Sequence, residues 1–186
     1  MNSSSENLPQ IILVTGASRS GKSEWAERLA GKTQMSVTYI ATANIDPTDA
    51  EWQARIDKHR QRRPKNWQIK TAQKELATIV NSALQTECLL IDSLGTWVAN
   101  FLDLDEESWQ KISDRLLANL QITPATVILV GEETGWGVVP AYKSGRVFRD
   151  RLGHLVRQIG GIADLVYLVT GGHILNLSLL GEPLDK

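Results

Sequence analysis

The sequence predicts an α/β fold in which helices cover both faces of a mainly parallel sheet. Short runs rich in Val, Ile and Leu alternate along the chain with longer segments of helical spacing. The 186 residues are 42% hydrophobic, which suffices to bury one core and leaves little room for a second domain. A glycine-rich turn joins the first apolar run to the first helical segment. We therefore expect one domain over residues 11–186 and a flexible N-terminus over residues 1–10.

The apolar runs are short and uninterrupted, as is typical of strands buried on both faces. The expected strands are residues 11–15, 36–42, 87–91, 126–130 and 164–169. Between them, apolar residues recur at helical intervals. The expected helices are residues 23–32, 48–60, 72–85, 106–121 and 143–160. The charged stretch 61–67 contains Pro64 and is expected to be a loop that closes the second helix.

Composition excludes several classes of partner. Twenty Lys+Arg residues stand against 21 Asp+Glu, so the net charge of -1 creates no general attraction to nucleic acid. The polar N-terminus does not resemble a signal peptide, and no apolar run approaches the ~18 residues that a membrane span needs. Cys88, the single cysteine, lies within an apolar run and fits a reducing compartment. We expect a cytoplasmic protein that neither binds nucleic acid nor inserts into a membrane.

The glycine-rich turn GASRSGKS matches the pattern G-x-x-x-x-G-K-[ST] between an expected strand and an expected helix. This context predicts a phosphate-binding P-loop, and with it a P-loop NTPase fold; a turn without function is the alternative that the context disfavours. The residues expected to bind nucleotide here are Gly16, Ala17, Ser18, Arg19, Ser20, Gly21, Lys22 and Ser23.

The chemistry of a P-loop assigns roles to some of these side chains. Backbone N–H groups and the helix N-terminus hold the phosphates, and Lys22 reaches the β and γ phosphates. The Ser23 hydroxyl can ligate Mg²⁺, which needs a further acidic ligand. Asp92 directly follows the expected strand 87–91 and should emerge at the carboxyl edge of the sheet, where such an acid is expected.

The expected helix 48–60 and the loop after it carry a basic stripe that includes an imidazole. Arg55, His59 and Arg62 or Arg63 recur at intervals of about four residues, which places them on one helix face. Guanidinium groups could bind phosphate there, and neighbouring positive charge would keep His59 neutral. From the pattern alone, a solvated helix face is the favoured interpretation.

A second loop, GEETGWGVVP at residues 131–140, follows the expected strand 126–130. Loops at the carboxyl ends of parallel strands commonly bind ligands in α/β proteins. Gly135, Gly137 and Pro140 are equally consistent with a turn that has only a structural purpose. The pattern leaves these two interpretations open.

The motifs together resemble a known family. LVTGASRSGKS, VTYIATA, E-x-x-x-RI-x-x-H-x-x-x-RP, LLID followed by WVAN, GWGVVP, R-x-FRD-x-LG and ADLVYLVTGG occur here in the same order as in bifunctional adenosylcobinamide kinase / adenosylcobinamide-phosphate guanylyltransferase of cobalamin biosynthesis. The resemblance covers about residues 11–174. It implies phosphorylation of adenosylcobinamide by ATP or GTP, followed by transfer of GMP from GTP to give adenosyl-GDP-cobinamide. It also implies a homo-oligomer, with a trimer as the expected state.

The resemblance assigns roles to individual residues. It implies that His59 becomes guanylylated. The transfer needs cations around the α-phosphate of the nucleotide, and Arg55, Arg62 and Arg63 could supply them. Covalent catalysis of this kind divides one difficult transfer into two displacements. The chemistry of the remaining residues suits the kinase step: Lys22, Ser23 and Asp92 would handle phosphates and Mg²⁺. Glu133 is placed to orient the incoming hydroxyl or a metal-bound water.

The sequence departs from the family pattern at three places. Glu132-Glu133-Thr134-Gly135 replaces Asn-Glu-Val-Gly, and Ala141-Tyr142-Lys143 replaces Glu-Asn-Arg. Trp67 is followed by Gln-Ile-Lys-Thr where the family has Trp-x-Thr-x-Glu. Two other functions remain open at this stage: a P-loop kinase for another small molecule, and a nucleotide-dependent regulatory switch. Neither accounts for the motifs outside the P-loop.

Overall fold

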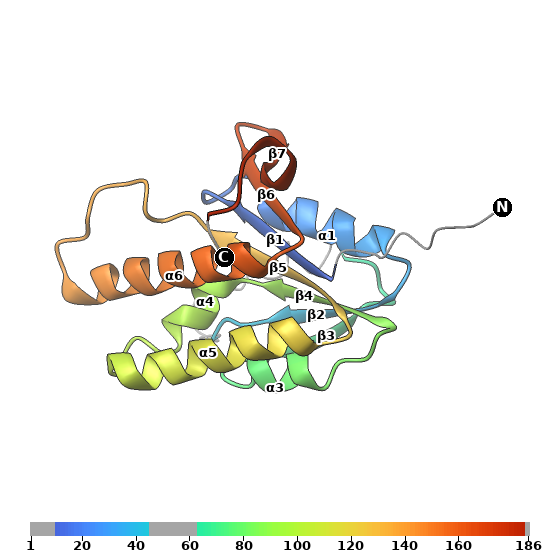
Figure 1. The fold of residues 1–186 in the computed structure, drawn as a ribbon, viewed down its shortest axis with the longest axis horizontal. Coiled ribbons are helices and arrows are strands. Elements are labelled where there is room, and N and C mark those ends of the chain that lie inside the picture. Colours follow the sequence, from blue (N-terminus) through green and yellow to red (C-terminus); the bar gives the residue numbers. More distant parts are fainter. Residues whose placement is uncertain (1–9, 45–62, 185–186) are drawn as a thin grey trace.

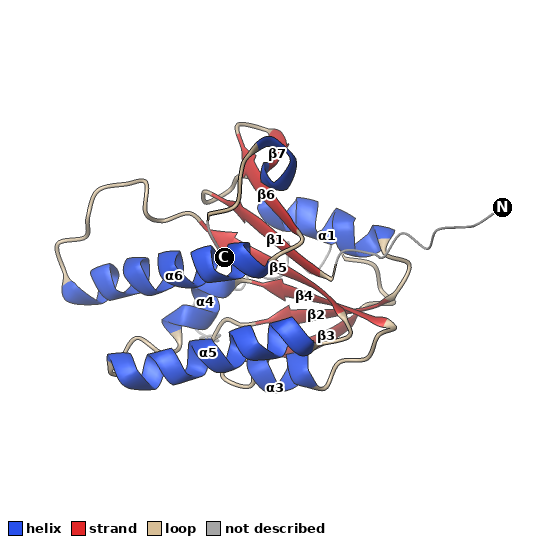
Figure 2. Ribbon diagram, in the orientation of Figure 1, coloured by secondary structure: helices blue, strands red, loops and turns tan. Residues whose placement is uncertain are grey.

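The computed structural model describes residues 10–44 and 63–184, which form a seven-stranded sheet with helices on both faces (Figures 1 and 2). In sheet order the strands are Gln68–Thr71 (β3), Ser36–Ala41 (β2), Glu87–Asp92 (β4), Thr126–Glu132 (β5), Ile11–Gly16 (β1), Leu165–Thr170 (β6) and His173–Asn176 (β7). Neighbouring strands pair in parallel from β3 to β6, and β7 is antiparallel to β6. The expected fold class is confirmed.

The helices divide between the two faces of the sheet. They are Lys22–Lys32 (α1), Leu76–Asn81 (α3), Leu94–Ala99 (α4), Glu106–Ile122 (α5), Lys143–Ile162 (α6) and Leu177–Leu180 (α7). Helix α1 packs on one face, and α3, α4, α5 and α6 cover the other (Figure 1). Since successive strand residues point to opposite faces, Ile12 packs on the α1 side and Leu13 on the α6 side. This alternation explains why the strands are apolar throughout.

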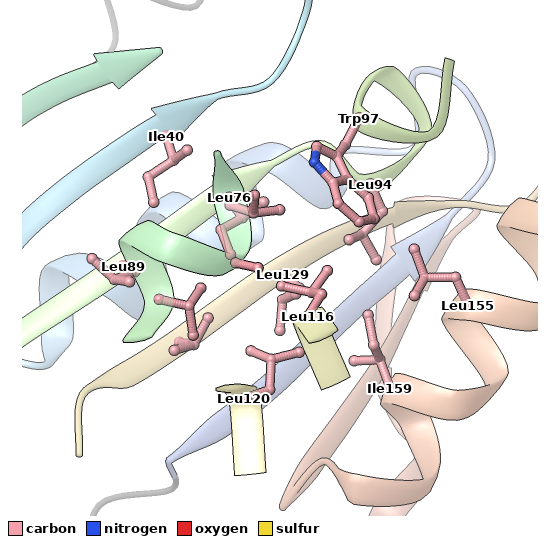
Figure 3. Close-up of a cluster of buried hydrophobic side chains, with 14 of the residues drawn as sticks. Ile40, Leu76, Leu89, Leu94, Trp97, Leu116, Leu120, Leu129, Leu155 and Ile159 are labelled. Atoms are coloured by element: carbon pink, nitrogen blue, oxygen red, sulfur yellow. The ribbon is translucent and has the colours of Figure 1, made fainter. Parts of the chain in front are cut away.

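The larger core cluster lies between the sheet and helices α3 to α6. Figure 3 shows aliphatic side chains from both layers meeting there, including Leu129 of β5, Leu116 and Leu120 of α5, and Leu155 of α6. Trp97, Phe101 and Trp109 extend this cluster with ring centroids 5.2–6.1 Å apart. Packing of this kind stabilises the layer that carries the loops of the carboxyl edge.

Most expected elements match the structure to within two residues at each end. The exception among described residues is the expected helix 72–85, because α3 spans only Leu76–Asn81. Ala72 instead continues the edge of the sheet, with its N–H donating to the Ala41 carbonyl at 2.8 Å. The apolar periodicity therefore identifies a helix, but the residues before it extend the edge of the sheet and the residues after it form a turn. The expected helix 48–60 lies outside the described residues.

Short elements were missed by sequence reasoning. Strand β3 is exposed along its length, so it carries no hydrophobic run and forms by pairing with the edge of β2. Helix α4 begins with a sequence signal that was available, because Ser93 is its N-cap and the Ser93 side chain accepts a hydrogen bond from the backbone N–H of Thr96.

Gly171 and Gly172, at φ 57° and 77°, make the tight turn between β6 and β7. Among residues 10–44 and 63–184, no helix has the length and apolar character needed to cross a bilayer.

Candidate nucleotide and metal site

The predicted P-loop connects the buried strand β1 to helix α1. Gly16 lies so close to β6 that an added Cβ would collide with the carbonyl oxygen of Val169 and lie 2.7 Å from Ser20 Oγ. Gly21 caps α1 with φ at 96°, a left-handed conformation that side chains disfavour. Between these glycines, Ala17, Ser18 and Arg19 are exposed to solvent. The sequence motif thus has the strand, turn and helix context on which its meaning depends.

Lys22 folds back over this turn. Its Nζ donates to the Ala17 carbonyl at 3.2 Å, and the residue as a whole is only 7% exposed. The ammonium therefore stays within the turn that the motif predicts to hold phosphates. A lysine in this position can offset charge that develops on a transferring phosphoryl group.

Ser23 and Asp92 meet beneath the P-loop although 69 residues separate them in sequence. Ser23 Oγ donates to Asp92 Oδ1 at 3.3 Å, and Tyr39 Oη donates to Asp92 Oδ2 at 3.1 Å. Burial and the nearby Asp92 carboxylate raise the pKa of Tyr39 far above its ordinary value, so this hydroxyl remains a donor. Strand β5 separates β1 from β4, and the two chain segments meet at the carboxyl edge of the sheet.

The consecutive acids at the end of β5 have different surroundings. Glu132 accepts from the Ser93 hydroxyl and from the Gly95 N–H, the latter at 2.8 Å, which ties it to the start of α4. Glu133 accepts from the Thr15 hydroxyl, and its own N–H donates to the Gly16 carbonyl at 3.0 Å. Of the two carboxylates, the one at position 133 therefore borders the P-loop.

Arg63 is the described member of the basic stripe. Its guanidinium carbon lies 3.2 Å from the centroid of the Tyr39 ring, and its Nε lies 3.6 Å from Glu27 Oε1 of α1. The Arg63 side chain is 8% exposed, so the structure places it in a packed contact beside the P-loop helix. Arg55, His59 and Arg62 lie outside the described residues.

Two recesses open along the carboxyl edge. One, of about 560 Å³, lies beyond β2 and is lined by residues that include Asn44, Gln73 and Asn100. The other, of about 330 Å³, lies between the β5–α6 loop and α6, and its lining includes Glu133, Trp136 and Arg157. The P-loop follows β1, which neighbours β5 in the sheet, so the second recess opens beside the P-loop, whereas β4 and β5 separate β2 from β1.

Comparison with known proteins places the chain in a family. The model for cobinamide kinase / cobinamide phosphate guanyltransferase matches residues 12–177. The chain belongs to this family. The bifunctional adenosylcobalamin biosynthesis protein CobP of Pseudomonas aeruginosa is 39% identical over 176 residues, covering 92% of this chain and 98% of that protein. The protein CobU of Escherichia coli strain K12, which bears the same description, is 38% identical over 177 residues, covering 87% and 96%.

Membership in the cobinamide kinase / cobinamide phosphate guanyltransferase family confirms the enzyme class that the motifs predicted. Solved structures agree on the fold. An ATPase from the type III secretion system of pathogenic bacteria has a TM-score of 0.55 at 12% identity, with 87% of this chain and 51% of that chain covered. A protein of Pyrococcus horikoshii OT3 has a TM-score of 0.56 at 7% identity, with 90% and 85% covered.

The site also contains residues that sequence reasoning missed. Thr15 and Tyr39 both lie in strands, and neither side chain was assigned a role from the sequence. The structure shows that their hydroxyls hold Glu133 and Asp92 respectively. No local signal identifies these pairs, because each joins residues from different strands. Within the described ranges, no group of three or more His, Cys, Asp or Glu side chains forms a metal cluster.

Proposed function

We propose that the chain phosphorylates the aminopropanol hydroxyl of adenosylcobinamide with ATP or GTP and then transfers GMP from GTP to the product. The final products are adenosyl-GDP-cobinamide and pyrophosphate. Family membership supports both reactions. The structural observation that carries the proposal is the approach of Ser23 to Asp92 beneath a P-loop whose lysine is held in place.

In the kinase step, the P-loop residues bind the triphosphate and Lys22 stabilises the transferring phosphoryl group. The acceptor oxygen forms a bond to the γ-phosphorus while the bond to the β–γ bridging oxygen breaks. Glu133 orients the hydroxyl and receives its proton. This role is supported by the position of Glu133, which contacts both Thr15 and Gly16 at the start of the P-loop.

The residues around Asp92 fit a magnesium ion. A serine hydroxyl and a carboxylate are the hard oxygen donors that Mg²⁺ prefers, and Ser23 Oγ and Asp92 Oδ1 lie 3.3 Å apart. Such an ion would neutralise charge on the β and γ phosphates. Tyr39 holds the second carboxylate oxygen, which fixes the orientation of Asp92.

For the guanylyl transfer, we propose His59 as the nucleophile, with Arg55, Arg62 and Arg63 binding the nucleotide. An imidazole nitrogen forms a bond to the α-phosphorus of GTP, and pyrophosphate leaves. A phosphate oxygen of the phosphorylated acceptor then attacks the same phosphorus, which breaks the P–N bond. Arg63, the described residue of the basic stripe, packs against Tyr39 and against Glu27 of α1, which supports a role for this arginine close to the P-loop helix.

We further propose a cytoplasmic homo-oligomer built from one catalytic domain over residues 11–186, with a trimer as its expected state. Support comes from helix α7, which follows the edge strand β7 and exposes Leu177, Leu179 and Leu180 by 36–79%. Exposed apolar side chains grouped in this way commonly mark an interface. Light scattering of the purified protein tests this: a mass of one chain contradicts it.

Incubation with GTP labelled at the α-phosphate tests the proposed function. We expect acid-labile label on the protein, its loss in His59→Ala, and continued phosphorylation of adenosylcobinamide by that variant. Mass spectrometry should locate GMP on His59. A label on Lys58, or retained labelling in His59→Ala, contradicts the assigned nucleophile. Phosphorylation without any labelling favours a kinase alone, and nucleotide-dependent assembly without use of adenosylcobinamide favours a regulatory switch.

A further inference from the structure

The loop between β5 and α6 exposes a concentration of apolar side chains. Trp136, Val138, Val139 and Tyr142 are 72%, 95%, 59% and 68% exposed. In Figure 1 this loop stands away from the sheet at the N-terminal end of α6, so these side chains contribute little to the core. We call this surface the apolar platform. Contiguous exposed apolar surface on a folded protein usually marks a binding site.

Side chains of α6 hold the platform in place. Arg149 donates to the Gly135 carbonyl at 2.5 Å, and Arg146 donates to the Pro140 and Ala141 carbonyls at 3.0 and 2.5 Å. Gly145 allows the loop to lie close to the helix, because an added Cβ would be 2.8 Å from Pro140 Cβ. The apolar side chains are therefore presented by a loop that is fastened at both ends. A surface prepared in this way loses less conformational entropy when it binds.

The platform is continuous with the proposed phosphoryl-transfer site. Its loop begins at Glu133, which contacts Gly16 and Thr15 of the P-loop strand. Trp136 belongs both to the platform and to the wall of the recess of about 330 Å³ that contains Glu133. A ligand that reaches the phosphates through this recess would therefore lie against the platform outside it.

We propose that this recess and the platform bind the corrinoid acceptor. The reactive hydroxyl of adenosylcobinamide lies at the end of a slender arm, whereas its corrin ring is broad, flat and rich in methyl groups. A recess of about 330 Å³ accommodates the arm but not the ring. The exposed tryptophan, tyrosine and valines offer a matching apolar surface for the ring. This inference rests on the proposed function, since it places the acceptor of that reaction.

Equilibrium dialysis with adenosylcobinamide tests the placement without turnover, in the presence of Mg²⁺ and a non-hydrolysable ATP analogue. We expect Trp136→Ala and Val138→Ser each to weaken binding of adenosylcobinamide, the first by about tenfold or more. The nucleotide affinity and the KM for ATP should stay within about twofold, because neither side chain belongs to the P-loop. Val138 is 95% exposed, so its substitution should not disturb folding.

Leu84→Ala provides a matched control. Leu84 is 64% exposed and precedes β4, so it lies at the amino-terminal ends of the strands, away from the carboxyl edge that carries the platform. The control variant should bind adenosylcobinamide as tightly as the unsubstituted protein. Unchanged corrinoid affinity in both platform variants overturns the inference, as does a change in oligomeric mass without a change in that affinity. If the unsubstituted protein neither binds nor phosphorylates adenosylcobinamide, the proposed function itself fails, and the inference with it.

Discussion

The P-loop and the β5–α6 loop leave neighbouring parallel strands at the same edge of the sheet, yet they differ in how closely they pack against the rest of the protein. The P-loop is compressed between β1, α1 and β6, where Gly16 has no space for a side chain. The β5–α6 loop extends outward and presents Trp136 and Val138 to solvent. Arginines of α6 support it through its backbone carbonyls. The first loop is shaped by the space available to its backbone, whereas the second exposes several apolar side chains.

This difference explains why only one of the two loops could be interpreted from sequence. A backbone site imposes strict demands, so glycines and a lysine must occur at set intervals in a strand–turn–helix context. A side-chain platform imposes looser demands, since several apolar residues could cover similar surface. For residues 131–140 the sequence therefore left ligand binding and simple turn geometry equally open.

The largest expected effect separates the chemistry of the two loops. Lys22→Ala should reduce turnover of the kinase step by about a hundredfold or more, because the ammonium offsets charge on the transferring phosphate. The KM for adenosylcobinamide should change little. Steady-state kinetics measure both, and circular dichroism checks the fold. Lys111→Ala removes an exposed lysine of α5 as a control. Near-normal phosphorylation by Lys22→Ala contradicts the P-loop assignment.

A set of glycine substitutions tests the contrast in packing. Gly16→Ala should destabilise the protein by ~1–3 kcal/mol, since its methyl group meets the Val169 carbonyl. Gly137→Ala in the β5–α6 loop has open space and should be nearly neutral. Gly31→Ala in α1 also has open space and should stabilise by about 0.5–1 kcal/mol through helix propensity. Urea unfolding compares the three. Equal losses for Gly16 and Gly137 would remove the contrast.

The smallest expected effect concerns the metal. Asp92→Asn should raise the Mg²⁺ concentration needed for half-maximal kinase activity by about tenfold, since the substitution removes a charged oxygen ligand. Nucleotide binding should weaken less, because the P-loop remains intact. Metal titrations at saturating ATP measure the first effect, and Asp114→Asn on α5 is an exposed control. An unchanged magnesium requirement would remove Asp92 from the site.

Much of the fold could be predicted because burial leaves a strong signal. The central strands are buried on both faces and therefore read as apolar runs, and α5 and α6 match the expected helices closely. Strand β3 lacks this signal because it is exposed and depends on β2 for its hydrogen bonds. The helix expected over 72–85 shows the opposite failure. The apolar periodicity there includes Ala72, which lies before α3 and hydrogen-bonds to the end of β2 at the edge of the sheet.

The sequence by itself determined the turn that should bind phosphate and the strand that delivers Asp92, and its ordered motifs resemble one family. The turn and the strand depend on residues that are close in sequence, so local spacing expresses them. Tertiary structure decided which hydroxyls hold Asp92 and Glu133, which guanidinium packs against Tyr39, and where the exposed side chains of the β5–α6 loop lie. Each of those contacts joins segments that are brought together only by strand order, which no local pattern encodes.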